Sequence, residues 1–357
     1  MKKPTRAARR YSIIVTEKRT RRRLRHRQRT RRRRQRRGKQ NLWSTYDWIY
    51  APKSFAIENR VQRSEVMRFL TEVRMRALAP NNRPVRINFD RTQFMFATAT
   101  LLFAAELDRV NKIRPGRISA NRPLSNRIAQ VIQHVGIAEK LGLKLQYPIT
   151  RRDVMFWSVD TGSEADGERA SRAMERYQHL IPGPQQRLYG GLTEAMTNCR
   201  QHAYDGERGD GFPNALPNWW MFSQYLDGVL CVALCDLGIG IPRSLPKDTS
   251  GMWGLIQSMF SKPEDDNDVR RIQAAIRVGA TRTLTANRGK GLMEIRSVLD
   301  GLGGRMHIHS NRGYYLYDAK KNAAKQEAET CMNFAPESSI QGTVLMWQIP
   351  VPKQASS

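Results

Sequence analysis

The stretch that decides the fold is GGLTEAMTNCRQHAY, at residues 190–204. In an α-helix, Glu194, Asn198 and His202 recur every four residues and share one face. Other faces of the helix offer apolar residues for packing, namely Leu192, Ala195, Met196 and Ala203. Polar residues four apart also describe an ordinary solvated face. The helix therefore indicates a functional site only together with the two glycine-rich turns that follow it.

The first turn follows the apolar run GVLCVALC at residues 228–235. This run is rich in β-branched and apolar residues and too short for a helix, which predicts a buried strand. The strand leads into DLGIG at residues 236–240. We expect Gly238 and Gly240 to allow positive φ and a close approach of a ligand to the backbone. Asp236, with two acceptor oxygens at the end of the strand, suits an exocyclic amine.

The second turn is NRGKGL at residues 287–292. It opens an apolar-periodic segment at residues 292–299, which predicts a helix whose free N–H groups and positive dipole end can hold phosphate. Arg288 and Lys290 are the nearest cations to that phosphate. Two glycines at 303–304 end the helix, and MHIHS at residues 306–310 alternates as a strand.

The ordered set of E-x-x-x-N, D-x-G-x-G, G-x-G and a terminal Gly-Thr resembles the GHKL ATPase fold. Within that family, TEAMTNCRQHAY at residues 193–204 looks most like the anti-sigma-factor serine kinases. The resemblance covers about residues 185–351 and implies a two-layer α/β sandwich, with a mixed sheet and helices on one face. Sensor kinases carry their phosphorylated histidine on a separate dimerisation helix, and none is evident in this sequence. We therefore interpret His202 as structural.

The resemblance also implies a role for each motif residue in binding ATP and Mg²⁺. Asn198 becomes the Mg²⁺ ligand, Glu194 the general base, and Asp236 the partner of the adenine amino group. One amide oxygen suffices, because Mg²⁺ takes oxygen ligands and keeps several waters. Gly238 and Gly240 form the turn under the adenine base, and Thr343 supports Asp236. The phosphate-facing lid is formed by Arg288, Gly289, Lys290 and Gly291.

The charge of the chain is concentrated at its N-terminus. The 357 residues carry a net charge of +29, and residues 1–40 hold 20 of the 61 Lys and Arg against one acid. The segment RTRRRLRHRQRTRRRRQRR at residues 19–37 has almost no apolar content, which predicts disorder or a helix formed only on a polyanion. We expect residues 1–40 to bind the phosphates of a nucleic acid, DNA or RNA, with a steep salt dependence. An anionic membrane is the minor alternative.

The segment after the tail predicts a small α/β layer, so that the whole chain belongs to the α/β class. The expected elements are a helix over 57–77, a strand over 85–89, a helix over 98–110, a strand over 118–120 and a helix over 124–135. This order loosely resembles the STAS domain of anti-sigma-factor antagonists. The family's Asp-Ser-Ser-Gly is replaced by Phe96-Ala97-Thr98-Ala99, which leaves Thr98 as the one hydroxyl and indicates a degenerate, docking domain. NLWSTYDWIY at residues 41–50 could stack on bases, but a core role is favoured.

The predicted organisation is a tail at 1–40, a STAS-like domain at 41–150, a linker and leading helix at 151–184 and a GHKL domain at 185–357. The longest apolar run, residues 94–105, is too short to cross a membrane, and four cysteines form no disulfide framework. We therefore expect a cytoplasmic protein that does not bind membranes.

Two classes of function remain open. The first is an ATP-using enzyme, either an ATPase whose lid closes and switches contacts to a protein partner or a serine/threonine kinase of the anti-sigma type. The second is a nonenzymatic ATP-binding adaptor. We favour the ATP-driven switch, with its oligomeric state open, a homodimer included.

Overall fold

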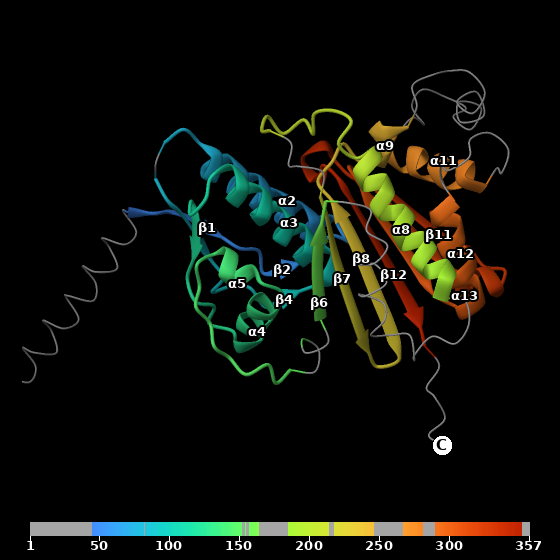
Figure 1. The fold of residues 1–357 in the computed structure, drawn as a ribbon, viewed down its shortest axis with the longest axis horizontal. Helices are drawn as coiled ribbons and strands as arrows, with labels where there is room; N and C mark the ends of the chain where they lie inside the picture. The colour runs from blue at the N-terminus through green and yellow to red at the C-terminus, as the bar shows by residue number, and fades with distance from the viewer. Residues whose placement is uncertain are drawn as a thin grey trace, which may run out of the picture.

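The computed structural model describes residues 45–81, 83–151, 154, 157–163, 185–213, 218–245, 267–280 and 290–351. It contains an N-terminal unit, residues 45–151, and a C-terminal unit made of the described residues from 157 onward (Figure 1). Both units combine helices and strands, which confirms the α/β class. The Arg-rich tail at 1–40 and the leading helix expected near 170–180 lie outside the described residues. Within the described part of the chain, no helix has the length and apolar character needed to span a membrane.

The N-terminal unit is built on a parallel sheet of three strands in the order β1-β3-β5. Its strands are β1 (Asp47–Tyr50), β3 (Val85–Asn88) and β5 (Ile118–Ala120), with β2 (Ser54–Phe55) and β4 (Phe94–Met95) forming a separate parallel pair. Its helices are α2 (Arg60–Leu78), α3 (Ala97–Ile113), α4 (Asn126–His134) and α5 (Ile137–Lys140). Asn59 caps α2 by accepting from the Gln62 N–H at 2.9 Å. The predicted elements of this segment are confirmed with small shifts at their ends.

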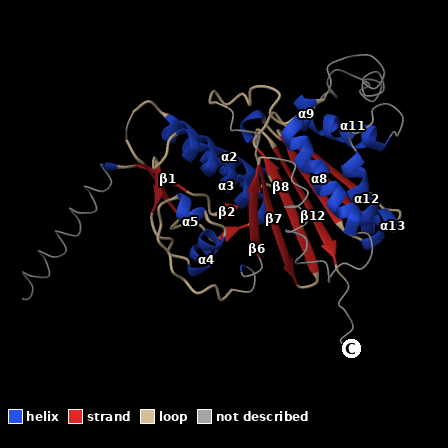
Figure 2. Ribbon diagram, viewed as in Figure 1, coloured by secondary structure: helices blue, strands red, loops and turns tan. Residues whose placement is uncertain are grey.

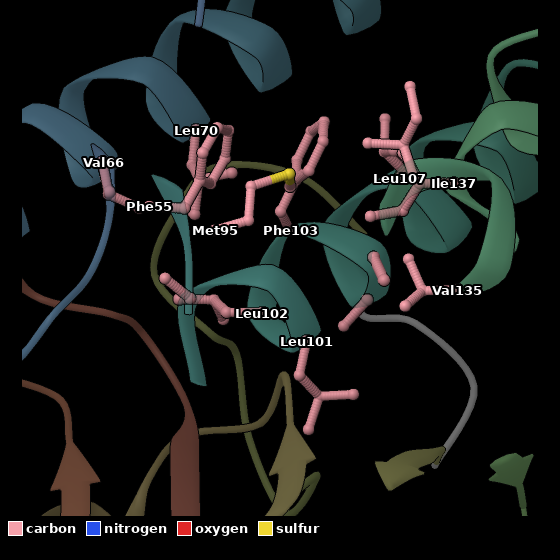
Figure 3. Packing of buried hydrophobic residues seen from close by; sticks show 14 of the residues in the cluster. Phe55, Val66, Leu70, Met95, Leu101, Leu102, Phe103, Leu107, Val135 and Ile137 are labelled. Carbon is pink, nitrogen blue, oxygen red and sulfur yellow. The ribbon is translucent and has the colours of Figure 1, made fainter. Parts of the chain in front are cut away.

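An aromatic cluster forms the core of this unit. The Phe103 ring on α3 lies 5.3 Å from those of both Phe55 and Phe69, measured between centroids. Figure 3 shows Phe103, Met95 and Leu70 gathered between α2 and α3, while Leu101 points away from that cluster toward the strands of the C-terminal unit. The buried core of the N-terminal unit therefore continues into the C-terminal sheet.

The C-terminal unit is built on a seven-stranded sheet in the order β11-β10-β9-β12-β8-β7-β6. Its strands are β6 (Trp157–Gly162), β7 (Trp219–Leu226), β8 (Val229–Asp236), β9 (Arg305–Ser310), β10 (Gly313–Asp318), β11 (Glu329–Asn333) and β12 (Thr343–Pro350). Its helices are α8 (Gln185–Gln201), α9 (Ile241–Ser244), α11 (Asp268–Ala280), α12 (Lys290–Leu302), α13 (Ala319–Ala323) and the 3-10 helix η3 (Pro336–Ser338).

Two expectations about this unit are wrong. The sheet is not mixed, because every pairing in it is antiparallel. Tight hairpins impose this direction: β7 and β8 are joined by Asp227 and Gly228, whose φ values of 50° and 79° suit a two-residue turn. The region 151–184 is also not only a linker, since Trp157–Gly162 forms β6 at the edge of the sheet.

Both faces of the seven-stranded sheet are covered (Figure 2). Leu230, Val232 and Leu234 of β8 point toward the core shared with α8, α11 and α12. Ala233 and Cys235, between them in the strand, point toward the core shared with α2 and α3. A strand buried on both sides has no polar face, which explains why the run at residues 228–235 is apolar throughout.

A buried ion cluster joins the two units. Glu106 on α3 accepts from Arg74 Nη1 on α2 at 2.6 Å and from Arg208 Nη2 at 2.5 Å. Arg109, one turn after Glu106, pairs with Asp210, and Arg208 Nη1 lies 3.2 Å from the same carboxylate. Arg208 and Asp210 belong to the loop between α8 and β7, so the cluster ties that loop to the N-terminal unit.

Arg63 makes a second polar connection from α2. Its guanidinium donates to the Ser338 carbonyl at 2.9 Å and to the Asn311 carbonyl at 2.7 Å. It also lies 4.1 Å from the centroid of the Phe334 ring. Arg63 is fully buried, and these contacts hold α2 against the loops that flank β9 and β12.

The ion cluster predicts the effect of neutralising Glu106. Burial acts to raise the pKa of Glu106, but Arg208 and Arg74 outweigh it and lower the pKa to about 2. Glu106→Gln removes the carboxylate that both guanidiniums share and leaves them with Asp210 alone, and we expect a loss of about 3 kcal/mol in the free energy of unfolding at neutral pH. Urea unfolding measures this, with Glu65→Gln, an exposed carboxylate on α2, as the control.

The pH dependence gives a second readout of the same variant. A depressed pKa stabilises the fold above the unfolded value of about 4.5 and loses that effect as pH falls toward 2. The difference between wild type and Glu106→Gln should therefore shrink on acidification. A variant with an unchanged unfolding midpoint at pH 7 would contradict the role given to the cluster.

Candidate functional site

Helix α8 positions the first two residues of the site. Its apolar side is buried against the sheet, as predicted for Leu192, Ala195 and Met196. Glu194 and Asn198 lie one turn apart, both half-buried. The helix ends at Gln201, so His202 lies in the turn that follows. Its Nδ1 is 3.6 Å from Asp205 Oδ2.

The end of α8 is locked to the turn after β8. The Ile239 N–H donates to the Ala203 carbonyl at 2.6 Å. A Cβ on Gly238 would lie 2.0 Å from that carbonyl oxygen, so no other residue fits there. Gly238 does not have the positive φ that we expected of it, whereas Gly240 does, at 80°. The constraint on Gly238 is this close backbone approach.

Asp236 ends β8 and faces Thr343 across the pair with β12. One carboxylate oxygen, Oδ1, accepts from the Gly238 N–H at 2.9 Å, and the other lies 3.8 Å from the Cys199 thiol on α8. Burial raises the pKa of Asp236 to about 6, against the hydrogen bonds from Gly238 and Thr343 that lower it. The side chain is 6% exposed. The result is a buried carboxylate whose pKa lies above its ordinary value.

Residues that the sequence analysis did not single out complete this corner. The Ser310 hydroxyl accepts from the Ile241 N–H at 2.9 Å and lies 3.1 Å from Thr343 Oγ1. Asn311 Nδ2 donates to the Ile239 carbonyl at 2.8 Å. On the other side, the Tyr204 hydroxyl donates to the Asn218 carbonyl at 2.7 Å and accepts from the Leu237 N–H at 3.3 Å. The one available signal was the Asn-Arg-Gly sequence directly after the strand predicted at residues 306–310.

The structure brings part of the predicted site together. Asn198 precedes Cys199, which contacts Asp236, and Glu194 lies one turn earlier on the same helix. Gly238 and Thr343 adjoin the aspartate, and Gly240 lies against the Asn311 side chain. Helix α12 begins at Lys290 and packs against α8. Arg288 and Gly289 lie outside the described residues, as does the side chain of Lys290. Gly291 is the second residue of α12.

The donor groups are of the chemical types that ATP and Mg²⁺ would require. Asp236 keeps acceptor capacity for an amino group, since a carboxylate has about four lone-pair sites. The described residues contain no cluster of three or more His, Cys, Asp or Glu suited to a metal. A magnesium ion held by one amide oxygen and by phosphates and water needs no such cluster, and Asn198 supplies the amide.

Thr98, the hydroxyl that remains in the STAS-like segment, is not presented to a kinase. It is 1% exposed at the start of α3 and donates to Glu58 Oε1 at 2.7 Å. Its hydroxyl thus has a structural role in joining α3 to the segment before α2.

Comparison of the chain with protein-family models, with curated proteins and with solved structures found no match. Function therefore has to come from the chemistry of the site.

The raised pKa of Asp236 predicts that Asp236→Asn stabilises the protein. A folded pKa near 6, above the unfolded value of 3.8, means that the ionised group opposes folding above about pH 6 and that this penalty vanishes below about pH 3.8. Without nucleotide, we expect Asp236→Asn to have a higher Tm than wild type at pH 8 and no such gain at pH 4. Asp205→Asn, at an exposed position, should show no comparable change. A lower Tm for Asp236→Asn at pH 8 would contradict the assignment.

Proposed function

We propose that this chain is a Mg²⁺–ATP-binding regulatory protein in which ATP binding and hydrolysis close a lid and switch contacts to a protein partner. The observation that carries the proposal is the buried Asp236 carboxylate with its raised pKa, set at a strand end and joined to the helix that bears Asn198 and Glu194. Carboxylates with a perturbed pKa are common at functional sites. The motif resemblance to GHKL ATPases points the same way.

In this proposal each residue has one task. Asp236 accepts a hydrogen bond from the adenine amino group, and Asn198 offers its side-chain oxygen to Mg²⁺. The ion, when bound, neutralises charge on the phosphates. Glu194 takes a proton from the attacking water, or from an acceptor hydroxyl in a kinase.

The ion cluster provides a route from the site to the N-terminal unit. The loop that carries Arg208 and Asp210 follows α8 directly, and Arg109 of α3 binds Asp210 together with the carbonyl of Pro213 at 2.8 Å. A movement of α8 on nucleotide binding would reach α3 through contacts that have little freedom to adjust. We infer that the surface of the N-terminal unit presents the nucleotide state to the partner.

The proposal predicts different effects for two variants. Asp236→Asn should weaken ATP binding, because an amide puts a donor where the adenine amine needs an acceptor. Glu194→Ala should leave ATP binding largely intact and abolish turnover, because binding does not use the base. Calorimetric titration with ATP and Mg²⁺, together with the fate of γ-labelled ATP, measures both. Glu65→Ala is the matched control on α2.

The outcomes separate the alternatives. Phosphate release that disappears in Glu194→Ala supports the ATPase, and label transferred to a protein supports the kinase. Asp236-dependent binding without turnover supports the nonenzymatic adaptor. Unchanged turnover in Glu194→Ala removes the assigned base, and unchanged ATP affinity in Asp236→Asn removes the adenine site.

We also propose that residues 1–40 tether the protein to nucleic acid. Their 20 cations and one acid should release counterions from a polyanion, and the affinity should fall steeply with salt. Deleting residues 1–40 should weaken binding to duplex DNA by about 100-fold or more at low salt and flatten its salt dependence. Fluorescence anisotropy across a salt series tests this, and a truncated chain with the original slope would contradict it.

A further inference from the structure

The parallel sheet of the N-terminal unit has one face that is not occupied by its crossover helices. Along the register of β1, β3 and β5, Ile49, Ile87 and Ala120 point into the core shared with α2 and α3. The alternate positions point to the opposite side. We call this side the outer face; it is formed by Tyr46, Trp48, Tyr50 and Arg86.

An outer face of this composition is unusual for a parallel sheet, because parallel sheets are normally covered on both faces. Tyr50 is 49% exposed, although tyrosine is a large ring that a core would accommodate. Tyr46, Trp48 and Arg86 are partly exposed. The composition of this aromatic segment favours a core role, but in the structure Ile49 alone of residues 47–50 is buried in the core.

Arginines lie on these rings. The Arg86 guanidinium is 5.0 Å from the centroid of Tyr46 and 5.4 Å from that of Trp48, and the Arg91 guanidinium is 5.5 Å from that of Tyr50. Flat rings and guanidinium planes side by side are the groups that stack on nucleobases. The same arginines supply positive charge for phosphates.

Outside the tail, the net positive charge of the chain lies in the N-terminal unit, which carries this face. Residues 45–151 hold 18 Lys and Arg against 8 Asp and Glu, whereas residues 152–357 hold 23 of each. The net +10 beyond the tail therefore belongs to the N-terminal unit. The basic tail at 1–40 ends shortly before β1, and its own charge disfavours it as an occupant of an arginine-lined face. A polyanion has the complementary charge.

We propose that the outer face binds single-stranded nucleic acid, with bases stacked on Tyr46, Trp48 and Tyr50 and phosphates held by Arg86 and Arg91. Rings that alternate along one strand are about 6.6 Å apart. This is about twice the 3.4 Å step of a duplex, so the bases they meet must be spread apart, as only a single strand allows. These contacts are separate from those of the tail and do not involve the proposed ATP site.

The test compares single strands with a duplex, using the full-length protein. Fluorescence anisotropy with labelled oligothymidylate, oligouridylate and a duplex of equal length is measured at one moderate salt concentration. We expect wild type to prefer the single strands. Tyr50→Ala and Arg86→Ala should each weaken single-strand binding by about tenfold. Both variants should leave duplex binding, which the tail supplies, nearly unchanged.

Matched controls separate stacking from folding and from bulk charge. Tyr50→Phe keeps the ring and should retain binding, while Met75→Ala removes an exposed apolar side chain on α2 and should have no effect. Arg68→Ala removes one exposed charge from α2 and should weaken the binding of single strands and of the duplex slightly and to the same degree. Equal losses on duplex and single strand in Tyr50→Ala, or a loss in Arg68→Ala as large as in Arg86→Ala, would overturn the proposal. ATP binding and turnover are measured separately, so failure of the ATP proposal leaves this result interpretable.

Discussion

The structure depends on covering both faces of the seven-stranded antiparallel sheet. Trp219 and Met221 of β7 point to the helices of the C-terminal unit, whereas Trp220 and Phe222 point to the N-terminal unit. A sheet with apolar side chains on both faces needs a layer on each side, and one chain here supplies both. The N-terminal unit is thus part of the same core, and its α3 serves as the cover that a two-layer sandwich lacks.

The ion cluster gives this apolar contact a defined alignment. Burial of hydrophobic surface is non-directional, so it does not by itself determine how α3 lies across the sheet. Glu106 pairs with arginines of α2 and of the loop after α8, and Asp210 pairs with arginines of α3 and of the same loop. These pairs are satisfied together in one arrangement of the three segments. Apolar replacements can match the stability of a buried ion pair, and we therefore infer that the cluster serves alignment more than stability. Because that loop continues from α8, the alignment extends to Asn198 and Glu194.

Sequence patterns predicted the local helices and strands but not the contacts between segments that are distant in the chain. The helices and strands of the N-terminal unit follow from periodicity, because each buries one face along its own length. Strand β6 escaped prediction because its sequence, WSVDTG, is polar and short at the edge of a sheet. Asp236 and its glycines lie near the end of α8, whereas the mixed sheet that the motif resemblance implied is wrong. The clamp by Ser310 and Asn311 and the arginine cluster depend on partners far apart in the chain, and no pattern in a single sequence reveals them.

Asp236 is the residue on which the proposed binding site depends most. The carboxylate accepts from the Gly238 N–H and from Thr343, and its second oxygen lies near the Cys199 thiol. Burial disfavours the ionised form, as the raised pKa records, so the charge works against folding at neutral pH. Carboxylates whose pKa is shifted against folding are common at functional sites, which is why we propose a ligand for Asp236. In that proposal, an acceptor-only side chain at the end of a buried strand would receive a donor such as the amino group of adenine.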